Sequence, residues 1–206
     1  MQAASRPGQL DDRLSFEERV YLLQVAREAL DLGVSGETLP SLDLPSIPSR
    51  LIEPGATFVT LTKNQELRGC IGSLEATRSL AEDVRVHAVA AALEDYRFPP
   101  VQVDELSQIS IEISRLTPPK LLKYQHPDEL LTQIRPGLDG VVVKKGIRRA
   151  TFLPQVWDKI PEVEVFLAML CRKMGAASDC WRGKNVEIST YQVEKFYEKN
   201  LPRESD

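Results

Sequence analysis

The sequence predicts an α+β fold, with a mainly antiparallel sheet and flanking helices arranged as two lobes of one domain. Two observations carry this prediction. Helical and strand patterns follow one another in mixed order along the 206 residues, and each half of the chain holds two strand patterns joined by a short polar turn. Strands joined by tight turns pair antiparallel, and such a mixed order is typical of α+β proteins. With 42% hydrophobic and 27% charged residues, the chain can bury a core without disulfides or metals.

Residues 1–14 are expected to be a disordered lead, residues 15–200 the single domain, and residues 201–206 a tail. The domain begins with a helix, because Ser15 and Glu18 form a capping box pattern and Gly33 supplies a stop signal. A proline-rich, extended connection follows over residues 34–50. A β-hairpin comes next, with strands at 57–62 and 66–73 around a polar turn.

A second capping box, at Ser79 and Glu82, begins a helix that ends near Asp95, where two prolines force an extended exit. Trp157 and Trp181 are expected to anchor either the core or the interface between the lobes. The remaining expected elements are a strand at 108–116, a short helix at 127–134, hairpin strands at 140–144 and 147–152, a helical start at 154, a helix at 162–174, a strand at 185–190 and a helical segment at 193–199.

The charge balance argues against a general nucleic-acid binder. The formal net charge is -4, whereas phosphate neutralisation needs a surplus of Lys and Arg. Four cations, Lys144, Lys145, Arg148 and Arg149, form a local surplus around a predicted hairpin tip. We interpret this cluster as a solvated turn, with nucleic-acid recognition through the hairpin as an alternative.

The cysteines and histidines do not have metal-ligand spacing. The three cysteines, Cys70, Cys171 and Cys180, form no CxxC pair, so neither zinc nor an iron-sulfur cluster is indicated, and no cofactor is identified. An apolar leader and an 18-residue apolar stretch are both missing from the sequence, so membrane insertion is not supported. We therefore expect a cytoplasmic protein with free thiols, in which Cys171 is a small buried apolar residue.

The hexapeptide LRGCIG at residues 67–72 is the candidate functional site. Strand alternation places Arg68 and Cys70 on one face, with Leu67 and Ile71 on the other. Because glycine has no Cβ, Gly69 and Gly72 allow a ligand, a neighbouring backbone or water to approach closely. The pattern indicates a place in the fold more clearly than it indicates a reaction.

Two hypotheses of different class fit this strand. In the first, it binds a ligand or docks a partner, and Arg68 is the anchor. In the alternative, Cys70 is a thiolate nucleophile, Arg68 holds an anionic substrate, and Glu112, Asp95 or His87 acts as general acid or base. A purely structural role, in which the glycines serve a bulge, is a further interpretation.

Three other residues complete the predicted binding set, which comprises Arg68, Gly69, Ile71, Gly72, Asp95, Arg97 and Arg149. Arg149 would form an anion site with Arg68 if the two lobes close over the hexapeptide. Asp95 and Arg97 also have a structural interpretation as a helix-end ion pair, in which Arg97 donates to the last carbonyls of the helix.

Several segments of the chain match the pattern of one family: 58–61, 67–72, 95–99, 105–106, 137–140 and 149–156, with Trp181 and Tyr191 as late aromatics. Through them the chain resembles the AMMECR family, which in prokaryotes is also called protein A of the AmmeMemoRadiSam system. The resemblance covers roughly residues 15–200 and implies a two-lobed, cytosolic α/β domain with the hexapeptide in a cleft region and no established activity. It also implies, as partners in a redox or modification pathway, a Memo-like protein and a radical S-adenosylmethionine enzyme.

Overall fold

The structure, a computed structural model, describes residues 13–198, which divide into two compact units. Unit 1 extends to Arg115 and resumes at Glu194, and unit 2 is Leu116–Val193. Helices and antiparallel strand pairs occur in both units, so the predicted α+β class is confirmed. Most of the predicted lead, and all of the predicted tail, lie outside the described residues. Leu14, which the sequence assigned to the lead, is buried in the core of unit 1.

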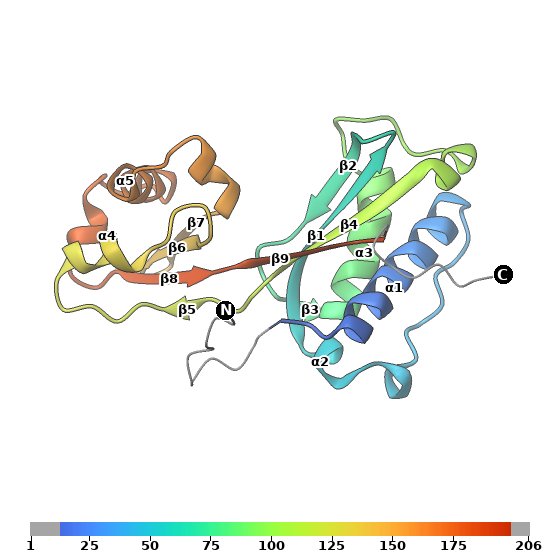
Figure 1. The fold of residues 1–206 in the computed structure, drawn as a ribbon, viewed down its shortest axis with the longest axis horizontal. Helices are drawn as coiled ribbons and strands as arrows, with labels where there is room; N and C mark the ends of the chain where they lie inside the picture. The colour runs from blue at the N-terminus through green and yellow to red at the C-terminus, as the bar shows by residue number, and fades with distance from the viewer. Residues whose placement is uncertain (1–12, 199–206) are drawn as a thin grey trace, which may run out of the picture. The chain divides into compact units, whose positions relative to one another are not determined.

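Unit 1 is built on a sheet whose strand order is β2-β1-β4-β9, with β3 paired to β1 (Figure 1). The strand β2 therefore lies at an edge of this sheet. The hairpin of β1 and β2 turns at Asn64 and Gln65, which both have positive φ, as a two-residue turn of type I′ requires. The strands are β1 (Pro54–Lys63), β2 (Glu66–Gly72), β3 (Arg78–Ser79), β4 (Ile109–Leu116) and β9 (Val193–Tyr197).

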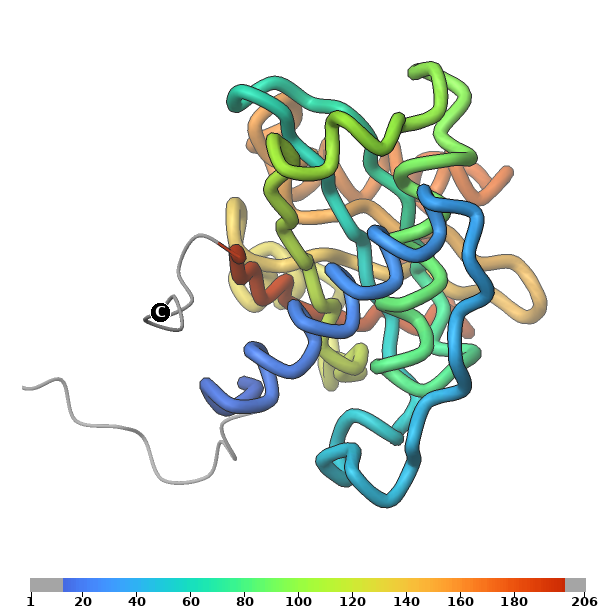
Figure 2. The backbone as a smooth tube through the Cα atoms, turned by 90° about the vertical axis from the view of Figure 1, so that its right-hand side faces the viewer, coloured from blue at the N-terminus to red at the C-terminus, as the bar shows by residue number. Residues whose placement is uncertain are grey.

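Two long helices, α1 (Phe16–Val34) and α3 (Leu80–Leu93), lie side by side and cover one face of this sheet (Figures 1 and 2). The capping box that begins α1 is present in full, because Ser15 and Glu18 each accept a hydrogen bond from the other's backbone N–H. At α3 only the Ser79 half forms, since Glu82 pairs instead with Arg85. The core between helices and sheet contains Leu22, Leu30, Leu51, Val59, Leu61, Val84, Ala88, Ile111 and Ile113.

The connection after α1 is more ordered than predicted. It contains the single-turn helices η1 (Leu44–Ser46) and α2 (Ser49–Ile52), and Ile47 between them is buried. After α3, the chain makes a turn at residues 95–98, in which the N–H of Phe98 donates to the Asp95 carbonyl, and then runs through the two prolines to η2 (Val103–Gln108) and β4. The predicted extended exit from the helix therefore does not begin until after this turn, and the segment contacts β2.

One predicted element of unit 1 is wrong. Residues 193–199 were expected to be helical, but 193–197 form the strand β9, beside β4 at the end of the sheet. Phe196 is buried in the core from this strand. Pairing with β4 and burial of one aromatic ring outweigh the local helix preference of the Glu and Lys residues around it.

Unit 2 holds a second sheet, with strand order β5-β8-β6-β7. The predicted hairpin is present as β6 and β7, which are antiparallel from Val141 opposite Phe152 to Lys145 opposite Arg148. The elements of this unit are β5 (Lys120–Leu121), η3 (Pro127–Glu129), α4 (Leu130–Gln133), β6 (Gly140–Lys145), β7 (Arg148–Phe152), η4 (Pro154–Asp158), α5 (Val163–Lys173), η5 (Cys180–Arg182) and β8 (Glu187–Tyr191).

Aromatic side chains fill the core of unit 2, one of the two places predicted for the tryptophans. Trp157 stacks on Phe166 with ring centroids 3.6 Å apart, and Phe152 meets Phe166 edge-on at 5.2 Å. Trp181 is also buried. The ring of Tyr191 lies against Gly140, where an added Cβ would come within 2.3 Å of the ring. This glycine is therefore required for packing.

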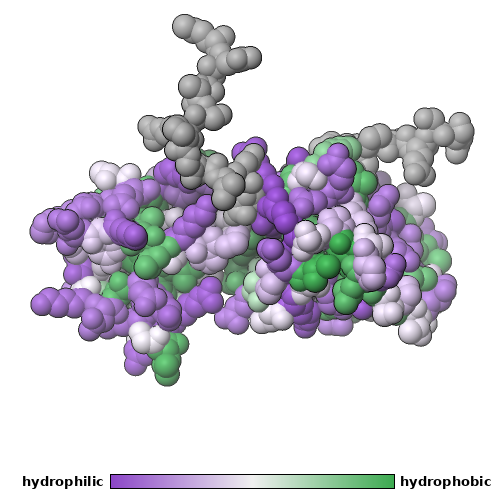
Figure 3. All heavy atoms as spheres, turned by 90° about the horizontal axis from the view of Figure 1, so that it is seen from below, coloured by the Kyte–Doolittle hydropathy of each residue, from purple (hydrophilic) through white to green (hydrophobic). Residues whose placement is uncertain are grey.

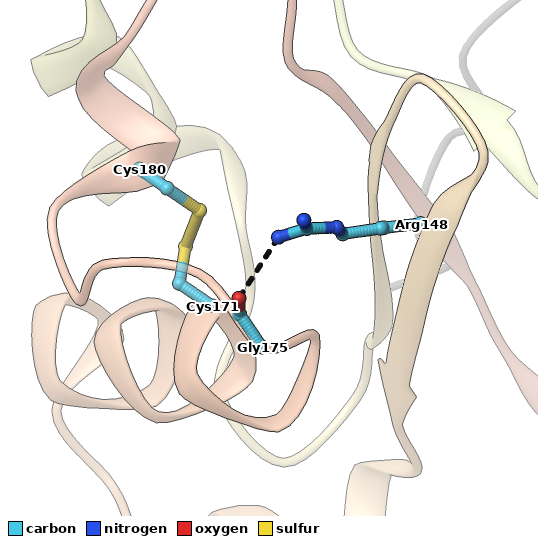
Figure 4. Close-up of a disulfide and its surroundings, with 4 residues drawn as sticks. All are labelled: Arg148, Cys171, Gly175 and Cys180. Atoms are coloured by element: carbon cyan, nitrogen blue, oxygen red, sulfur yellow. Dashed lines mark hydrogen bonds between the residues drawn. A yellow bond between two sulfur atoms is a disulfide. The ribbon is translucent and has the colours of Figure 1, made fainter.

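The expectation that all three thiols are free is wrong. Cys171 of α5 and Cys180 of η5 form a disulfide, and Cys70 is the free cysteine of the described residues (Figure 4). Their Cα atoms are 6.0 Å apart, within the range that a disulfide spans. The nine-residue sequence separation did not predict this pairing, because it depends on how the loop after α5 folds back onto the helix.

The surface in Figure 3 carries hydrophilic side chains with apolar ones scattered among them, as is usual for a folded protein in water. Within residues 13–198, every helix is too short or too polar to cross a bilayer.

Candidate functional site

The edge strand β2 carries the hexapeptide, and a bulge interrupts the predicted alternation of its two faces. Leu61 lies opposite Gly69 and Thr62 opposite Leu67, so Arg68 has no partner on β1 and forms a bulge. Directly opposite residues of paired strands share a face, so Leu67 lies on the same face as Cys70, and the prediction that it shares a face with Ile71 is wrong. Bulges redirect side chains at sheet edges. The Arg68 side chain extends from this bulge toward the segment that follows α3, as its hydrogen bonds to Pro99 and Glu105 indicate.

At both glycines of the hexapeptide, neighbouring protein atoms fill the space that a side chain would need. A Cβ on Gly69 would lie 2.0 Å from the backbone oxygen of Ala91 in α3. A Cβ on Gly72 would lie 2.3 Å from the backbone oxygen of Thr57. Of the three possibilities left by the sequence (ligand, backbone or water), the close neighbour is backbone. The glycines let α3 and β1 pack tightly against β2.

Cys70 sits at the centre of the strand and is half-buried. Its Sγ accepts a hydrogen bond from Thr60 Oγ1 on β1 at 3.3 Å, directly across the pair. Its backbone groups point away from β1. The N–H of Cys70 donates to Asp95 Oδ2 at 2.8 Å, and its carbonyl accepts from Arg97 Nη2 at 3.2 Å.

Asp95 and Arg97 therefore act on the strand edge and not on the helix end. Their carboxylate and guanidinium form two hydrogen bonds, of 2.8 and 2.6 Å, which confirms the predicted ion pair. The structural interpretation had Arg97 donating to the last carbonyls of the helix, but the acceptor is Cys70. The two side chains satisfy both outward backbone groups of Cys70, as an adjacent strand would. The hydrogen bonds from Arg97 hold the pKa of Asp95 well below its usual range.

Arg68 is engaged by a second carboxylate. It donates to Glu105 from Nε at 3.1 Å and from Nη2 at 2.9 Å, and to the carbonyl of Pro99 at 2.8 Å. Lys63 also contacts Glu105, at 2.9 Å. Hydrogen bonds from Arg68, the Gln102 backbone and Lys63 lower the pKa of Glu105 to about 2. An external anion would have to displace Glu105 to bind Arg68 by the same fork.

The other two candidate acid or base residues, Glu112 and His87, pair with residues other than Cys70. Glu112 lies on β4, which is separated from β2 by β1, and it pairs with Lys195 at 3.1 Å. His87 is buried in α3, with Nδ1 at 3.2 Å from Asp83. Arg149 belongs to unit 2 and Arg68 to unit 1, so their joint anion site stays a prediction.

Sequence reasoning missed three partners of this site: Thr60, Glu105 and the backbone role of Asp95. A hairpin without a bulge would have placed Val59 opposite Cys70, and it is the bulge at Arg68 that brings Thr60 there. Glu105 is 37 residues from Arg68 in sequence, and no local pattern links the two. A buried cluster of Asp83, Thr57 and His87 was also missed. Asp83 Oδ2 accepts from the N–H and hydroxyl of Thr57, which ties α3 to β1.

We call the surface formed by residues 67–72 and 95–105 the β2 rim. Several apolar side chains on it are exposed. Tyr96 is 95% exposed, although its two neighbours in sequence are bound to Cys70. Leu67 is 44% and Val103 60% exposed. The rim thus combines an ordered backbone with apolar groups that are partly or almost fully exposed.

Comparison with known proteins identifies the family. The AMMECR1 family profile matches residues 23–196. The chain belongs to the AMMECR1 family. A relative from Methanocaldococcus jannaschii, Protein MJ0810, is 37% identical over 192 residues, which cover 90% of this chain and 92% of that one. Protein PF1979 of Pyrococcus furiosus is 36% identical, with 93% and 92% covered.

A solved structure supports the same assignment. The crystal structure of the uncharacterized protein PH0010 from Pyrococcus horikoshii matches with a TM-score of 0.69 and 34% identity, covering 92% of this chain and 95% of that one. The resemblance inferred from the hexapeptide and its companion segments is therefore confirmed. These AMMECR1 proteins bring no named activity to the site, so its chemistry must be argued from its own residues.

Proposed function

We propose that this AMMECR1 protein is a partner-docking component of a cytosolic redox or modification pathway, and that it works through the β2 rim. The observation that carries the proposal is Tyr96. A tyrosine that is 95% exposed stands on a turn whose flanking side chains, Asp95 and Arg97, are both fixed to the Cys70 backbone. Tyrosines are enriched among the residues that contribute most to protein interfaces.

The anchoring matters because binding costs conformational entropy. A side chain on a mobile loop must be ordered when a partner binds, whereas a turn that is already held loses less freedom. Three hydrogen bonds join Asp95 and Arg97 to each other and to their own backbone, and two more join them to Cys70. The turn is therefore preorganised to present Tyr96.

The companions implied by the AmmeMemoRadiSam system, a Memo-like protein and a radical S-adenosylmethionine enzyme, are the partners we propose. Leu67 and Val103 would add apolar area around the tyrosine, and Arg97 would supply a charged group at its side. Apolar centres with a polar surround are typical of protein interfaces.

Catalysis by a Cys70 thiolate is the competing hypothesis, and the geometry supports it less. Asp95 is ion-paired with Arg97 and keeps its charge, so it is a poor proton acceptor. Arg68 already binds Glu105. An exposed tyrosine is also not needed for a thiol reaction, whereas docking accounts for it.

The test is a binding titration of the purified chain against each purified companion. Tyr96→Ala should weaken binding at least tenfold, because truncation of an interface hot spot costs about 2 kcal/mol or more. Tyr197→Ala is the matched control, since Tyr197 is 40% exposed on β9. Equal binding by the wild type and Tyr96→Ala, or no binding to either companion, would refute the proposal.

A further inference from the structure

The hairpin tip of unit 2 breaks a local rule of sheet stability. Lys144 lies opposite Arg149, and Lys145 lies opposite Arg148, in the register of β6 and β7. Like charges directly opposite each other on neighbouring strands are destabilising. All residues from 144 to 149 are exposed, and the turn between the strands is Gly146 and Ile147. Two successive like-charge pairs are an unfavourable choice for a turn with no other role.

Successive pairs along a hairpin point to opposite faces, so each face of this ribbon carries one lysine and one arginine. Ile147 at the tip is fully exposed. Exposed contacts help to hold the ribbon, among them an ion pair of 3.2 Å between Lys144 and Glu187 and a hydrogen bond of 3.0 Å from Arg148 to the Gly175 carbonyl (Figure 4). Such exposed contacts contribute little and can be exchanged for others.

The charge of the chain is divided unevenly. Unit 2 contains twelve Lys and Arg against eight Asp and Glu, whereas unit 1 contains fourteen against twenty-two. The formal charge of -4 for the whole chain therefore conceals a basic unit whose surplus equals the four cations of one hairpin.

We propose that the β6–β7 hairpin binds the major groove of double-stranded DNA. A ribbon with cations on both faces and an apolar tip matches a groove with phosphates on both walls and base edges at its floor. The major groove admits a two-stranded β-ribbon, and thymine methyl groups there offer apolar contacts. A planar anionic surface would favour cations on one side. Single strands are usually held by stacking on aromatic rings, and residues 144–149 contain none.

Geometry also predicts a preference between duplexes. The major groove of A-form RNA is deep and too narrow for side chains to read. The hairpin should therefore bind B-form DNA more tightly than an RNA duplex of the same sequence. Four phosphate contacts would give a slope of about -3.6 in log affinity against log salt, since each contributes about -0.9.

The test measures the affinity of the full chain for a fluorescent DNA duplex of about two helical turns, across roughly 50–200 mM salt. Lys145→Gln with Arg149→Gln should reduce the magnitude of the slope by about 1.8. The control pair, Lys120→Gln with Lys123→Gln, removes the same charge from exposed positions of unit 2 and should leave the slope unchanged. Ile147→Ser should lower the affinity without changing the slope.

Several outcomes would overturn the proposal. One is the absence of saturable binding at the lowest salt. A second is equal loss in the hairpin and control pairs, which would indicate general attraction to unit 2. A third is equal affinity for RNA and DNA duplexes. A fourth is hairpin-dependent binding to vesicles of anionic lipid with hairpin-independent binding to DNA. Thermal unfolding of each variant, unchanged from the wild type, excludes misfolding as the cause.

Discussion

Replacing Gly69 by alanine tests whether the hexapeptide glycine is there for packing. The added Cβ would lie 2.0 Å from the carbonyl oxygen of Ala91 and 3.0 Å from its carbonyl carbon. Carbon–oxygen contacts in proteins are normally about 3.3–3.6 Å, so the overlap exceeds about 1 Å. The clashing atoms are backbone of α3, and no rotation of a side chain can relieve the clash. Either β2 or α3 must move.

The expected cost is about 3 kcal/mol, the upper end of the range for inserting one extra carbon into a packed core. A domain of this kind is stable by about 5–15 kcal/mol, so the loss is large. Gly33→Ala is the matched control in the same unit. Its Cβ would meet only the Val89 side chain, at 3.0 Å, and alanine is preferred to glycine in a helix by about 1 kcal/mol. We expect its net effect to be within about 1 kcal/mol of zero.

Denaturant unfolding can assign the loss to a unit. Both tryptophans, Trp157 and Trp181, lie in unit 2, whereas the long helices α1 and α3 lie in unit 1. Far-ultraviolet circular dichroism therefore includes unit 1, and tryptophan fluorescence reports unit 2. Gly69→Ala should lower the midpoint of the circular dichroism transition more than that of fluorescence. A free energy of unfolding within about 0.5 kcal/mol of the wild type would refute the packing argument, because that is the usual range of inert surface changes.

Three further predictions follow from the contacts of the site and of unit 2. The pKa of Glu105 is lowered from 4.5 to about 2, so its contribution to the stability of the folded state is complete above pH 4.5 and is lost as the pH falls toward 2. Glu105→Gln should remove this part of the acid dependence, and the measurement is the free energy of unfolding between those two pH values. Reduction of the Cys171–Cys180 disulfide should cost about 2–3 kcal/mol, from closure of its short loop, in unfolding followed by tryptophan fluorescence, and no loss with reductant would contradict the bridge. The rate at which Cys70 reacts with an alkylating agent should change less than twofold in Arg68→Ala, because Arg68 binds Glu105 and not the thiol. Mass spectrometry at a series of pH values gives the rate. A slower reaction in the variant, with a raised thiol pKa, would instead show that Arg68 activates the thiol.

Local patterns in the sequence predicted the parts of the fold that local physics determines. The Ser15 capping box, the β1–β2 hairpin and the basic hairpin each depend on residues close in the chain. The strand β9 was missed because its partner β4 is distant in sequence, and pairing overrode local preference. The disulfide was missed because the protein was first inferred to be cytoplasmic, and thiols in the reducing cytoplasm are expected to be free.

The candidate site shows the same division. The sequence located the hexapeptide and the Asp95–Arg97 pair, because each is a short motif. It could not show that the pair binds the Cys70 backbone, or that Arg68 is bound to Glu105, since both contacts join segments at least 25 residues apart. The roles of the charged residues at the site, Arg68, Asp95 and Arg97, thus depended on partners that are distant in the sequence.

An exposed edge strand invites pairing with another chain, and proteins block such edges with charged side chains or covering loops. Here the block is built from Asp95 and Arg97, which occupy the outward groups of Cys70. A partner at the β2 rim is therefore expected to bind through side chains and not by adding a strand. The roles within one turn are therefore separate: Asp95 and Arg97 bind the strand edge, and Tyr96 between them is exposed and, under the docking proposal, is the residue that contacts the partner. Substitution of the flanking residues should damage the fold and docking together, whereas substitution of Tyr96 should affect docking alone.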